Sequence, residues 1–301
     1  MAEARLAASL LSEARTTTDR HLTDLARQLE GQVPGRLGQA LGYALGTSGK
    51  RVRPALVFAS YRTLGGTHPA IHRLATAVEV IHTYSLIHDD LPCMDDDGQR
   101  RGRPTTHVVY DPVTAARVGY LLVPVAVEVL SAATRELELG PEVRQAVARV
   151  LLDASGIRGM VGGQWLDLAA EGRSLGPDDL REIHLRKTAA LIQGACLVGG
   201  LAAGARDRVL DALGRFGLEI GLAFQVADDV LDATATSAQL GKTAGRDLSL
   251  QKSTYVSVYG VEQAREEARQ CVERAAGHLA SAGIESAPLL SLAHYIVQRQ
   301  S

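Results

Sequence analysis

The chain has 301 residues, of which 46% are hydrophobic and 22% charged, and its formal net charge at pH 7 is −2. This is the composition of a folded globular protein rather than a disordered one. The nearly balanced charge argues against a nucleic-acid surface, because binding a phosphate backbone needs an excess of basic residues. The three cysteines, Cys93, Cys196 and Cys271, are too few and too widely spaced for a disulfide framework, so we expect a reducing, cytoplasmic setting.

Neither a signal peptide nor a stable membrane span is expected. Residues 1–15 carry two acidic side chains and lack the basic-then-apolar order of a signal peptide. The longest uncharged run, residues 188–205, is rich in alanine and glycine and includes Gln193. We therefore expect this run to form a helix that is buried in protein rather than in lipid.

Taken in chain order, helical periodicity is interrupted at breaks that contain glycine or proline. These breaks fall at residues 31–35, 65–69, 92–104, 140–141, 171–177 and 237–248. Residues 141–164 give a clear helical signal, because a proline suits the first turn and apolar residues recur at three- and four-residue steps. Gly156, Gly159 and Gly163 follow at similar steps and would let another helix approach closely. Residues 254–260 have the β-branched and aromatic content of a strand, but nothing nearby could pair with them.

The pattern predicts an all-α fold. No fixed-period repeat, low-complexity tract or Pro/Ser-rich linker divides the chain. Helices of about 11–20 residues with short connections would give a bundle of ten or more helices over this length. We expect a single domain over residues 1–301.

Two aspartate-rich clusters stand out from this helical background. The first comprises Asp89, Asp90, Asp95, Asp96 and Asp97, and the second comprises Asp228, Asp229 and Asp232. In a helix Asp228 and Asp232 share one face, where their charges repel each other unless a cation binds. A single cluster could be an exposed acidic helix end. Two clusters that are both embedded in apolar sequence favour a binding role.

The chemistry of these side chains points to a metal-bound polyphosphate. Carboxylate ligands without histidine or cysteine favour a hard cation such as Mg2+, which completes its shell with water and phosphate oxygens. Cations for the remaining phosphate oxygens are available in Lys50, Arg51, Arg53, Arg100, Arg101, Lys187, Lys242 and Lys252. The chain has neither a GxxxxGK[ST] loop nor a GxGxxG loop, so a nucleotide cradle is not indicated.

Seven blocks in order resemble the trans-isoprenyl diphosphate synthase (polyprenyl synthetase) family, most closely its bacterial farnesyl diphosphate synthases. The blocks are GKRVRP (49–54), EVIHTYSLIHDDLPCMDDDGQRRG (79–102), GMVGGQWLDL (159–168), HLRKTAALI (184–192), GLAFQVADDVLD (221–232), LGKTAGRD (240–247) and KSTY (252–255). The family's DDxxxxD motif matches Asp89, Asp90 and Asp95, and its DDxxD motif matches Asp228, Asp229 and Asp232. The resemblance extends from about Gly31 to Gln300.

The resemblance implies helices around a deep central cavity, usually in a homodimer, and head-to-tail condensation of an allylic diphosphate with isopentenyl diphosphate. It implies two or three Mg2+ ions, with Asp89, Asp95 and Asp228 as direct ligands and Asp90, Asp229 and Asp232 as further participants. It gives catalytic roles to Asp89, Asp95, Asp228, Arg100, Lys187 and Lys242. It places the allylic diphosphate on Arg100, Lys187, Thr188, Gln225, Lys242 and Lys252, and isopentenyl diphosphate on Gly49, Lys50, Arg53, His82 and Arg101. Gln164 and Asp167 are expected near the diphosphate.

The expected reaction breaks a carbon–oxygen bond to give an allylic cation and pyrophosphate, so positive groups must stabilise the leaving group. No side-chain general base is required, since the proton can leave with the pyrophosphate. In the family, bulky residues just before the first motif end chain growth. Tyr84, five residues before Asp89, is therefore the expected floor of the product pocket and favours a fifteen-carbon product; the less favoured alternative is an ordinary core aromatic residue.

Four positions depart from the family pattern. Gly119-Tyr120 replaces a Gly-Asp pair, Pro124 follows inside the same helix, and Ala189 and Val256 replace a glycine and a proline. Tyr120 and Pro124 are expected near the hydrocarbon pocket, where either could alter product length or lower activity.

Other functions remain open at this point. The chain could make geranyl or geranylgeranyl diphosphate. It could be a class I terpene cyclase, although such enzymes normally have a second metal motif that mixes Asn, Ser or Thr with Glu. It could also be a non-catalytic partner subunit of a related synthase, although a decayed subunit would not need both aspartate clusters.

Overall fold

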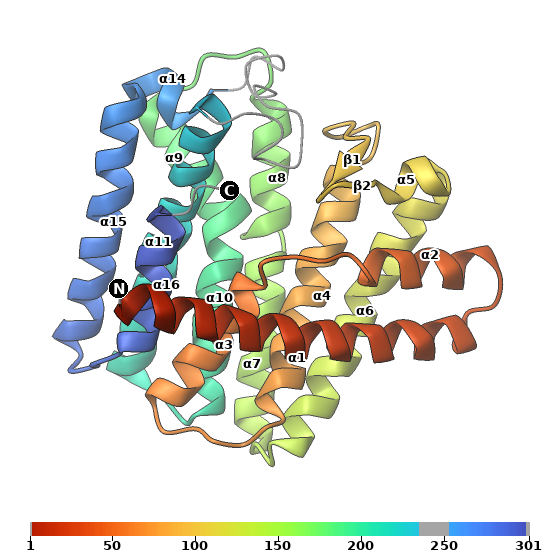
Figure 1. The fold of residues 1–301 in the computed structure, drawn as a ribbon, viewed down its shortest axis with the longest axis horizontal. Coiled ribbons are helices and arrows are strands. Elements are labelled where there is room, and N and C mark those ends of the chain that lie inside the picture. The colour runs from red at the N-terminus through yellow and green to blue at the C-terminus, as the bar shows by residue number, and fades with distance from the viewer. Residues whose placement is uncertain (1, 235–252, 299–301) are drawn as a thin grey trace.

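The computed structural model describes residues 2–234 and 253–298, and these are helical almost throughout (Figure 1). The helices are α1 (Ala2–Gln32), α2 (Arg36–Leu45), α3 (Val52–Thr63), α4 (Ile71–Asp89), α5 (Thr106–Val109), α6 (Pro112–Glu136), α7 (Pro141–Ser155), α8 (Met160–Ala169), α9 (Pro177–His184), the π-helix η1 (Leu185–Ala189), α10 (Ala190–Ala202), α11 (Asp207–Thr234), α14 (Tyr255–Tyr259), α15 (Val261–Ser281) and α16 (Ala287–Gln298). Two short antiparallel strands, β1 (Gln99–Arg100) and β2 (Arg103–Pro104), form a hairpin. The predicted all-α class and the predicted number of helices are confirmed.

Helix boundaries follow the local sequence. Helix α7 begins with Pro141 at its first turn, as predicted, but the predicted helical stretch 141–164 is divided, since α7 ends before Gly156 and α8 begins at Met160. Residues 254–260, which have the composition of a strand, instead form α14. The Thr254 side chain accepts a hydrogen bond from the Ser257 backbone N–H, and the Ser257 hydroxyl accepts one from the Thr254 N–H. This capping box starts a helix where β-propensity alone suggests a strand.

Helix α10 lies at the centre of the molecule and packs on α3, α7 and α11. Most of its side chains are buried, so the prediction of a protein-buried helix in this uncharged run is confirmed. A Cβ atom on Gly199 would lie 2.4 Å from the Val57 carbonyl oxygen, so only glycine permits the observed contact with α3. Gly163 has the same role between α8 and η1, where a Cβ atom would lie 2.1 Å from the Lys187 backbone nitrogen.

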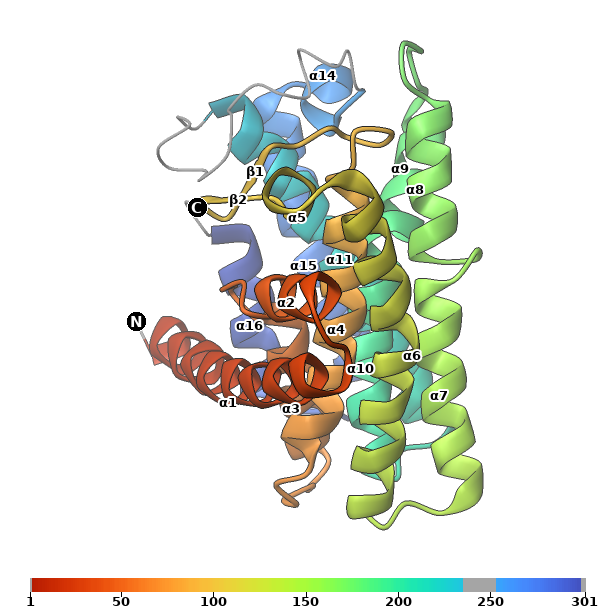
Figure 2. The same cartoon turned by 90° about the vertical axis from the view of Figure 1, so that its right-hand side faces the viewer.

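Pairs of long helices surround this centre and set the position of the site. Helix α4 packs mainly on α6, and α11 packs mainly on α15. Helices α1 and α2 cross the bundle in Figure 1, and Figure 2 shows them on one side of it. The hairpin β1–β2 and helix α14 lie at the same end of the bundle in both views. The first aspartate cluster begins at the end of α4, and the second lies near the end of α11.

Helices α6, α7 and α8 lie at the right-hand edge of the molecule in Figure 2. These helices and the turn between α7 and α8 carry exposed apolar side chains. We call these residues the outer apolar face: Val113, Tyr120, Val127, Leu152, Ile157, Val161 and Trp165. Within the described residues α6 alone is long and apolar enough to cross a membrane by length and composition, and only 33% of its most apolar window is buried.

The structure corrects the predicted position of two departures from the family pattern. Tyr120 is 74% exposed and Pro124 is also exposed, so both lie on the outside of α6 rather than at a hydrocarbon pocket. Helix α6 continues through Pro124 to Glu136 without a break.

Candidate active site

A cavity of about 730 Å³ lies at the junction of α1, α3, α4, α8, η1 and α11. Its wall includes the following predicted site residues: Gly49, Lys50, Arg53, His82, Asp89, Arg100, Arg101, Gln164, Lys187, Thr188, Gln225 and Asp228. Asp89 and Asp97 of the first cluster and Asp228 of the second therefore line the same space, although the two clusters are more than a hundred residues apart in the chain. Lys242 and Lys252 lie outside the described residues.

Asp89 ends α4 and faces the cavity from a largely apolar helix. The loop after it is tight, because the Asp95 N–H donates to the Asp89 carbonyl oxygen at 2.9 Å and the Asp97 N–H donates to that of Asp90 at 3.2 Å. Burial raises the pKa of Asp89, Lys187 opposes this shift, and the charge of Asp95 adds to it. A bound cation would remove the cost of this crowding of negative charge.

Asp90 is buried and pairs with Arg100, whose Nε donates to Asp90 Oδ1 at 2.6 Å. Asp97 lies 3.7 Å from the same guanidinium group. Burial raises the pKa of Asp90 to about 7, although the charge of Arg100 and its hydrogen bond both act to lower it. Asp90 thus orients a cation that lines the cavity. This geometry fits the expectation that Asp90 participates beyond the direct ligands.

The second cluster also contains one aspartate that faces the cavity and one that is buried. Asp228 faces the cavity, whereas Asp229 is 3% exposed and hydrogen-bonded within the protein. Asp229 Oδ2 accepts from the Tyr255 backbone N–H at 2.9 Å, and its Oδ1 accepts from Gln225 Nε2 at 3.1 Å. Gln225 in turn accepts a hydrogen bond from Thr188 at 2.8 Å. Asp229 therefore ties α11 to α14 and, through Gln225, to η1. The third aspartate, Asp232, is also buried.

The π-helix η1 presents Lys187 and Thr188 to the cavity. Single π-turns are frequent at functional sites. Lys187 Nζ lies 2.5 Å from Asp167 Oδ2, in the block where the sequence also predicts Gln164 near the diphosphate. Gln164 is 7% exposed and lines the cavity, and neither atom of its amide group has a hydrogen-bond partner among the described residues. A buried amide of this kind suits a ligand oxygen.

A second group of cations lies on the cavity wall where the loop between α2 and α3 meets the first cluster. Lys50 and Arg53 line the wall there, and Arg101 donates to the Ser48 carbonyl oxygen at 2.8 Å. A Cβ atom on Gly49 would lie 2.5–3.0 Å from the Arg101 guanidinium, so glycine allows this approach. Burial, and then the charges of Arg53 and Arg101, hold the pKa of His82 well below its usual value, so the ring is neutral.

Five predicted residues of the described part of the chain do not line this cavity, namely Tyr84, Asp90, Asp95, Asp229 and Asp232, whereas unpredicted residues such as Arg15 and Tyr295 do. Asp95 and Tyr84 are half-buried beside Asp89, and the Tyr84 ring packs edge to face on His88 at 5.0 Å between centroids. Asp96 is exposed. Arg15 from α1 and Tyr295 from α16 complete the wall. Sequence reasoning missed these two because no local pattern marks residues that arrive from opposite ends of the chain.

The chain is similar to known proteins over most of its length. The family model described as polyprenyl synthetase matches residues 34–286. The chain is 44% identical over 265 residues to farnesyl diphosphate synthase of Escherichia coli (strain K12), which covers 87% of this chain and 88% of that protein. It is also 44% identical over 275 residues to the chloroplastic heterodimeric geranylgeranyl pyrophosphate synthase large subunit 1 of Arabidopsis thaliana, covering 89% of this chain and 73% of that protein.

Solved structures agree as well. An apo FPP/GFPP synthase from Zymomonas mobilis superposes with a TM-score of 0.84 at 36% identity, covering 98% of this chain and 99% of that one. A geranyltransferase from Helicobacter pylori, complexed with magnesium and isoprenyl diphosphate, superposes with a TM-score of 0.81 at 32% identity, covering 95% and 96%. The chain belongs to the polyprenyl synthetase family, has its all-α isoprenoid synthase fold and is a trans-prenyltransferase.

Proposed function

We propose that this protein condenses an allylic diphosphate, dimethylallyl or geranyl, with isopentenyl diphosphate head to tail, with farnesyl diphosphate as the product. The observation that carries the proposal is the shared cavity wall. Asp89 and Asp228 face one space together with the cations expected for both diphosphates. These cations form two basic sets, Arg100 with Lys187, and Lys50 with Arg53 and Arg101. A single metal-bound diphosphate would need only one of the two sets. Two basic sets support two diphosphate substrates.

The donor set on this wall fits Mg2+, because Asp89 and Asp228 offer only carboxylate oxygens. Within residues 2–234 and 253–298 no three metal-binding side chains are gathered closely enough to hold an ion by themselves. Mg2+ commonly uses one or two carboxylates and takes its other ligands from water and substrate phosphates. When bound, two or three such ions would neutralise pyrophosphate charge as the carbon–oxygen bond breaks.

The residues of the chain supply the remaining chemistry. Arg100 and Lys187 are held by Asp90 and Asp167, so that their charges face the leaving group without reorganising during the reaction. Lys50 and Arg53 hold isopentenyl diphosphate on the other side of the cavity, where its double bond can attack the allylic cation. The apolar parts of the wall exclude water that would quench this cation. The proton is lost to pyrophosphate, because burial and the neighbouring arginines lower the pKa of His82 and make its imidazole a weak base.

The test is an assay with purified protein, Mg2+, labelled isopentenyl diphosphate and each of the five-, ten- and fifteen-carbon allylic starters. We expect turnover with the two shorter starters and a fifteen-carbon product. No turnover in any mixture would contradict the proposal and favour a non-catalytic partner subunit. Cyclised hydrocarbon from farnesyl diphosphate alone would favour a terpene cyclase.

Product length is the finer part of the proposal, since the named relatives include both farnesyl and geranylgeranyl synthases. Tyr84, packed on His88 below Asp89, supports an end at fifteen carbons. A twenty-carbon product would make the chain a geranylgeranyl synthase, and a ten-carbon product a geranyl synthase.

We also propose that the protein is a cytoplasmic homodimer that associates through the outer apolar face. An apolar groove of about 490 Å³ lies beside this face and is lined by Leu91, Pro92, Cys93, Pro112, Val113, Ala116, Arg117 and Tyr120. Large exposed apolar areas are uncommon on monomers. All three cysteines are free thiols, which supports a reducing compartment.

A further inference from the structure

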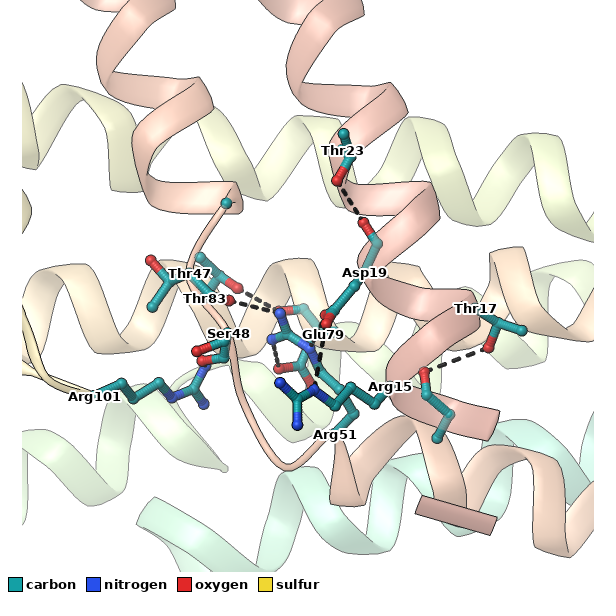
Figure 3. A network of polar contacts seen from close by, with 12 residues as sticks. Arg15, Thr17, Asp19, Thr23, Thr47, Ser48, Arg51, Glu79, Thr83 and Arg101 are labelled. Carbon is teal, nitrogen blue, oxygen red and sulfur yellow. Dashed lines mark hydrogen bonds and ion pairs between the residues drawn. The ribbon is translucent and has the colours of Figure 1, made fainter. Parts of the chain in front are cut away.

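Arg51 lies inside the basic block GKRVRP, but its side chain is bound within the protein. It is 3% exposed, and its three guanidinium nitrogens contact three different parts of the chain (Figure 3). Nε donates to Asp19 Oδ1 of α1 at 2.7 Å, and Nη1 donates to Glu79 Oε1 of α4 at 2.6 Å. Nη2 donates to the Thr47 carbonyl oxygen at 2.6 Å. The guanidinium fork therefore links two helices to the loop that carries Lys50.

The backbone at Arg51 is unusual as well. Its φ is 53°, in the left-handed region that non-glycine residues seldom adopt, and it caps the start of α3. Such a conformation persists only where the surroundings fix it. The buried contacts with Asp19 and Glu79 do so here. Lys50 lies directly before this left-handed residue and Arg53 lies in the first turn of α3, and both are on the cavity wall.

The same loop is fixed from its other side by Arg101, which donates to the Ser48 carbonyl oxygen at 2.8 Å and lies against Gly49. Figure 3 shows Arg101 and Arg51 reaching the loop from different directions. Residues 47–51 are thus clamped between a buried network and a cavity-lining cation. A change on the buried side must move the backbone that carries Lys50.

We propose that Arg51 is a positioning residue for the isopentenyl diphosphate site: its buried fork fixes the loop so that Lys50 and Arg53 meet that diphosphate together. This inference rests on the proposed function. It differs from a direct role, in which Arg51 itself would contact the phosphate. The cavity wall reaches Arg51 and Glu79, so the experiment must separate the two roles.

The test measures KM for isopentenyl diphosphate, KM for geranyl diphosphate, kcat and melting temperature in Arg51→Lys. A lysine keeps the charge, but its donors lie on one nitrogen and cannot reproduce the planar fork that reaches three separated acceptors. We expect KM for isopentenyl diphosphate to rise about tenfold or more, with the other two kinetic constants within about twofold. The matched control is Arg62→Lys, since Arg62 also joins α3 to α1 by pairing with Glu13, at 2.5 and 2.7 Å, away from the cavity. It should lower the melting temperature and leave both KM values unchanged.

Glu79→Gln separates positioning from direct binding, and it serves also if Arg51→Lys does not fold. The amide keeps an acceptor but weakens the hold on the Arg51 fork. Positioning predicts a rise of several-fold in KM for isopentenyl diphosphate. A direct phosphate contact predicts an unchanged or lower KM, because the guanidinium loses a competing carboxylate. An unchanged KM for isopentenyl diphosphate in both Arg51→Lys and Glu79→Gln would overturn the inference, as would equal rises in both KM values.

Assays of the wild type distinguish failure of the proposed function from failure of this inference alone. Calorimetry with isopentenyl diphosphate alone and the turnover assay are done first on the unchanged protein. No binding and no turnover there would remove the proposed function and this inference with it. Binding and turnover in the wild type, with no selective effect in the variants, would remove the inference alone.

Discussion

Asp228 and Asp229 are neighbours in sequence but lie in different environments. Asp228 faces the cavity, whereas both oxygens of Asp229 accept hydrogen bonds from Tyr255 and Gln225. A motif that reads DDxxD therefore contains one side chain placed for a ligand and one placed for the fold. The first cluster repeats the division, since Asp89 faces the cavity and Asp90 holds Arg100.

The two roles predict different losses. Asp228→Ala should lower kcat at least a hundredfold, because it removes a carboxylate that would hold Mg2+ against the leaving group. Asp229→Ala should in addition lower the melting temperature. It leaves the buried Tyr255 N–H without its acceptor, which costs about 1–3 kcal/mol, and each kcal/mol corresponds to about 2–4 °C in proteins of about 150–250 residues. Thermal unfolding and steady-state kinetics measure both effects.

Asp229→Asn is the matched control, because its amide oxygen can still accept from the Tyr255 N–H. It should recover most of the melting temperature. Equal stability of Asp229→Ala and wild type would contradict the structural role, and full activity of Asp228→Ala would contradict the placement of that residue at the reaction.

Tyr84→Ala tests the floor of the product pocket. Removing the ring that packs on His88 opens space beneath Asp89, so products should lengthen from fifteen to twenty carbons or more. Chromatography of the dephosphorylated products measures the change. Tyr120→Ala is the control, because this ring is on the outside of α6 and its loss should leave product length unchanged. A fifteen-carbon product from Tyr84→Ala would show that chain growth ends elsewhere.

At the scale of elements, the sequence predicted helices best where one helix supplies its own periodicity and caps. Helix α7 has the apolar periodicity and a proline in its first turn, and its start agrees with the prediction, whereas the break at Gly156 was not predicted. Helix α14 was not predicted, because its residues have the composition of a strand and its short capping box outweighs that propensity. The hairpin β1–β2 was missed because two residues per strand leave no alternating pattern.

Site residues, like helices, could be predicted only where the local sequence signals them. Residues inside a dense motif, such as Asp89 or Lys50, could be proposed because neighbouring residues signal them. The network that joins Arg51 to Asp19 and Glu79 could not, since its partners lie 32 and 28 residues away and only packing brings them together. Tyr120 was placed wrongly because its position in the family pattern does not show which face of α6 is turned to the surface.

Helix α1 is held against α3 by an ion pair whose contribution depends on pH. The hydrogen bond from Arg62, opposed by burial, lowers the pKa of Glu13 below its usual 4.5. The folded chain therefore binds this proton less tightly than the unfolded chain. The stabilisation is present above pH 4.5 and is lost as the pH falls through the folded-state value.

Glu13→Gln should therefore lower the free energy of unfolding by about 0.5–1 kcal/mol at pH 7, as expected for a half-exposed pair. The difference from wild type should shrink below pH 4.5. Urea unfolding at pH 7, 5 and 3.5 measures this. A difference that stays constant with pH would mean that packing, rather than charge, accounts for the effect of the substitution.

At the scale of the whole molecule, the outer apolar face is the largest feature that the central cavity does not explain. It spans three helices and continues into the groove beside Leu91 and Tyr120. Covering it with a second copy would bury large side chains such as Ile157 and Trp165, at about 1.5–3 kcal/mol for each large apolar side chain fully buried. The same face would also suit lipid, since α6 is apolar enough to span a membrane.

A charged pair of substitutions decides between these partners. Ile157 is 80% exposed and Val127 is 38% exposed, so Ile157→Glu with Val127→Glu should leave the fold of one chain intact but place charges inside a dimer contact. Light scattering after size exclusion should give twice 32.0 kDa for wild type and 32.0 kDa for the double variant. Tyr259→Gln, at an exposed ring outside the face, should remain dimeric. A wild type that runs as a monomer and floats with lipid vesicles would contradict the dimer, because the face would then be covered by lipid.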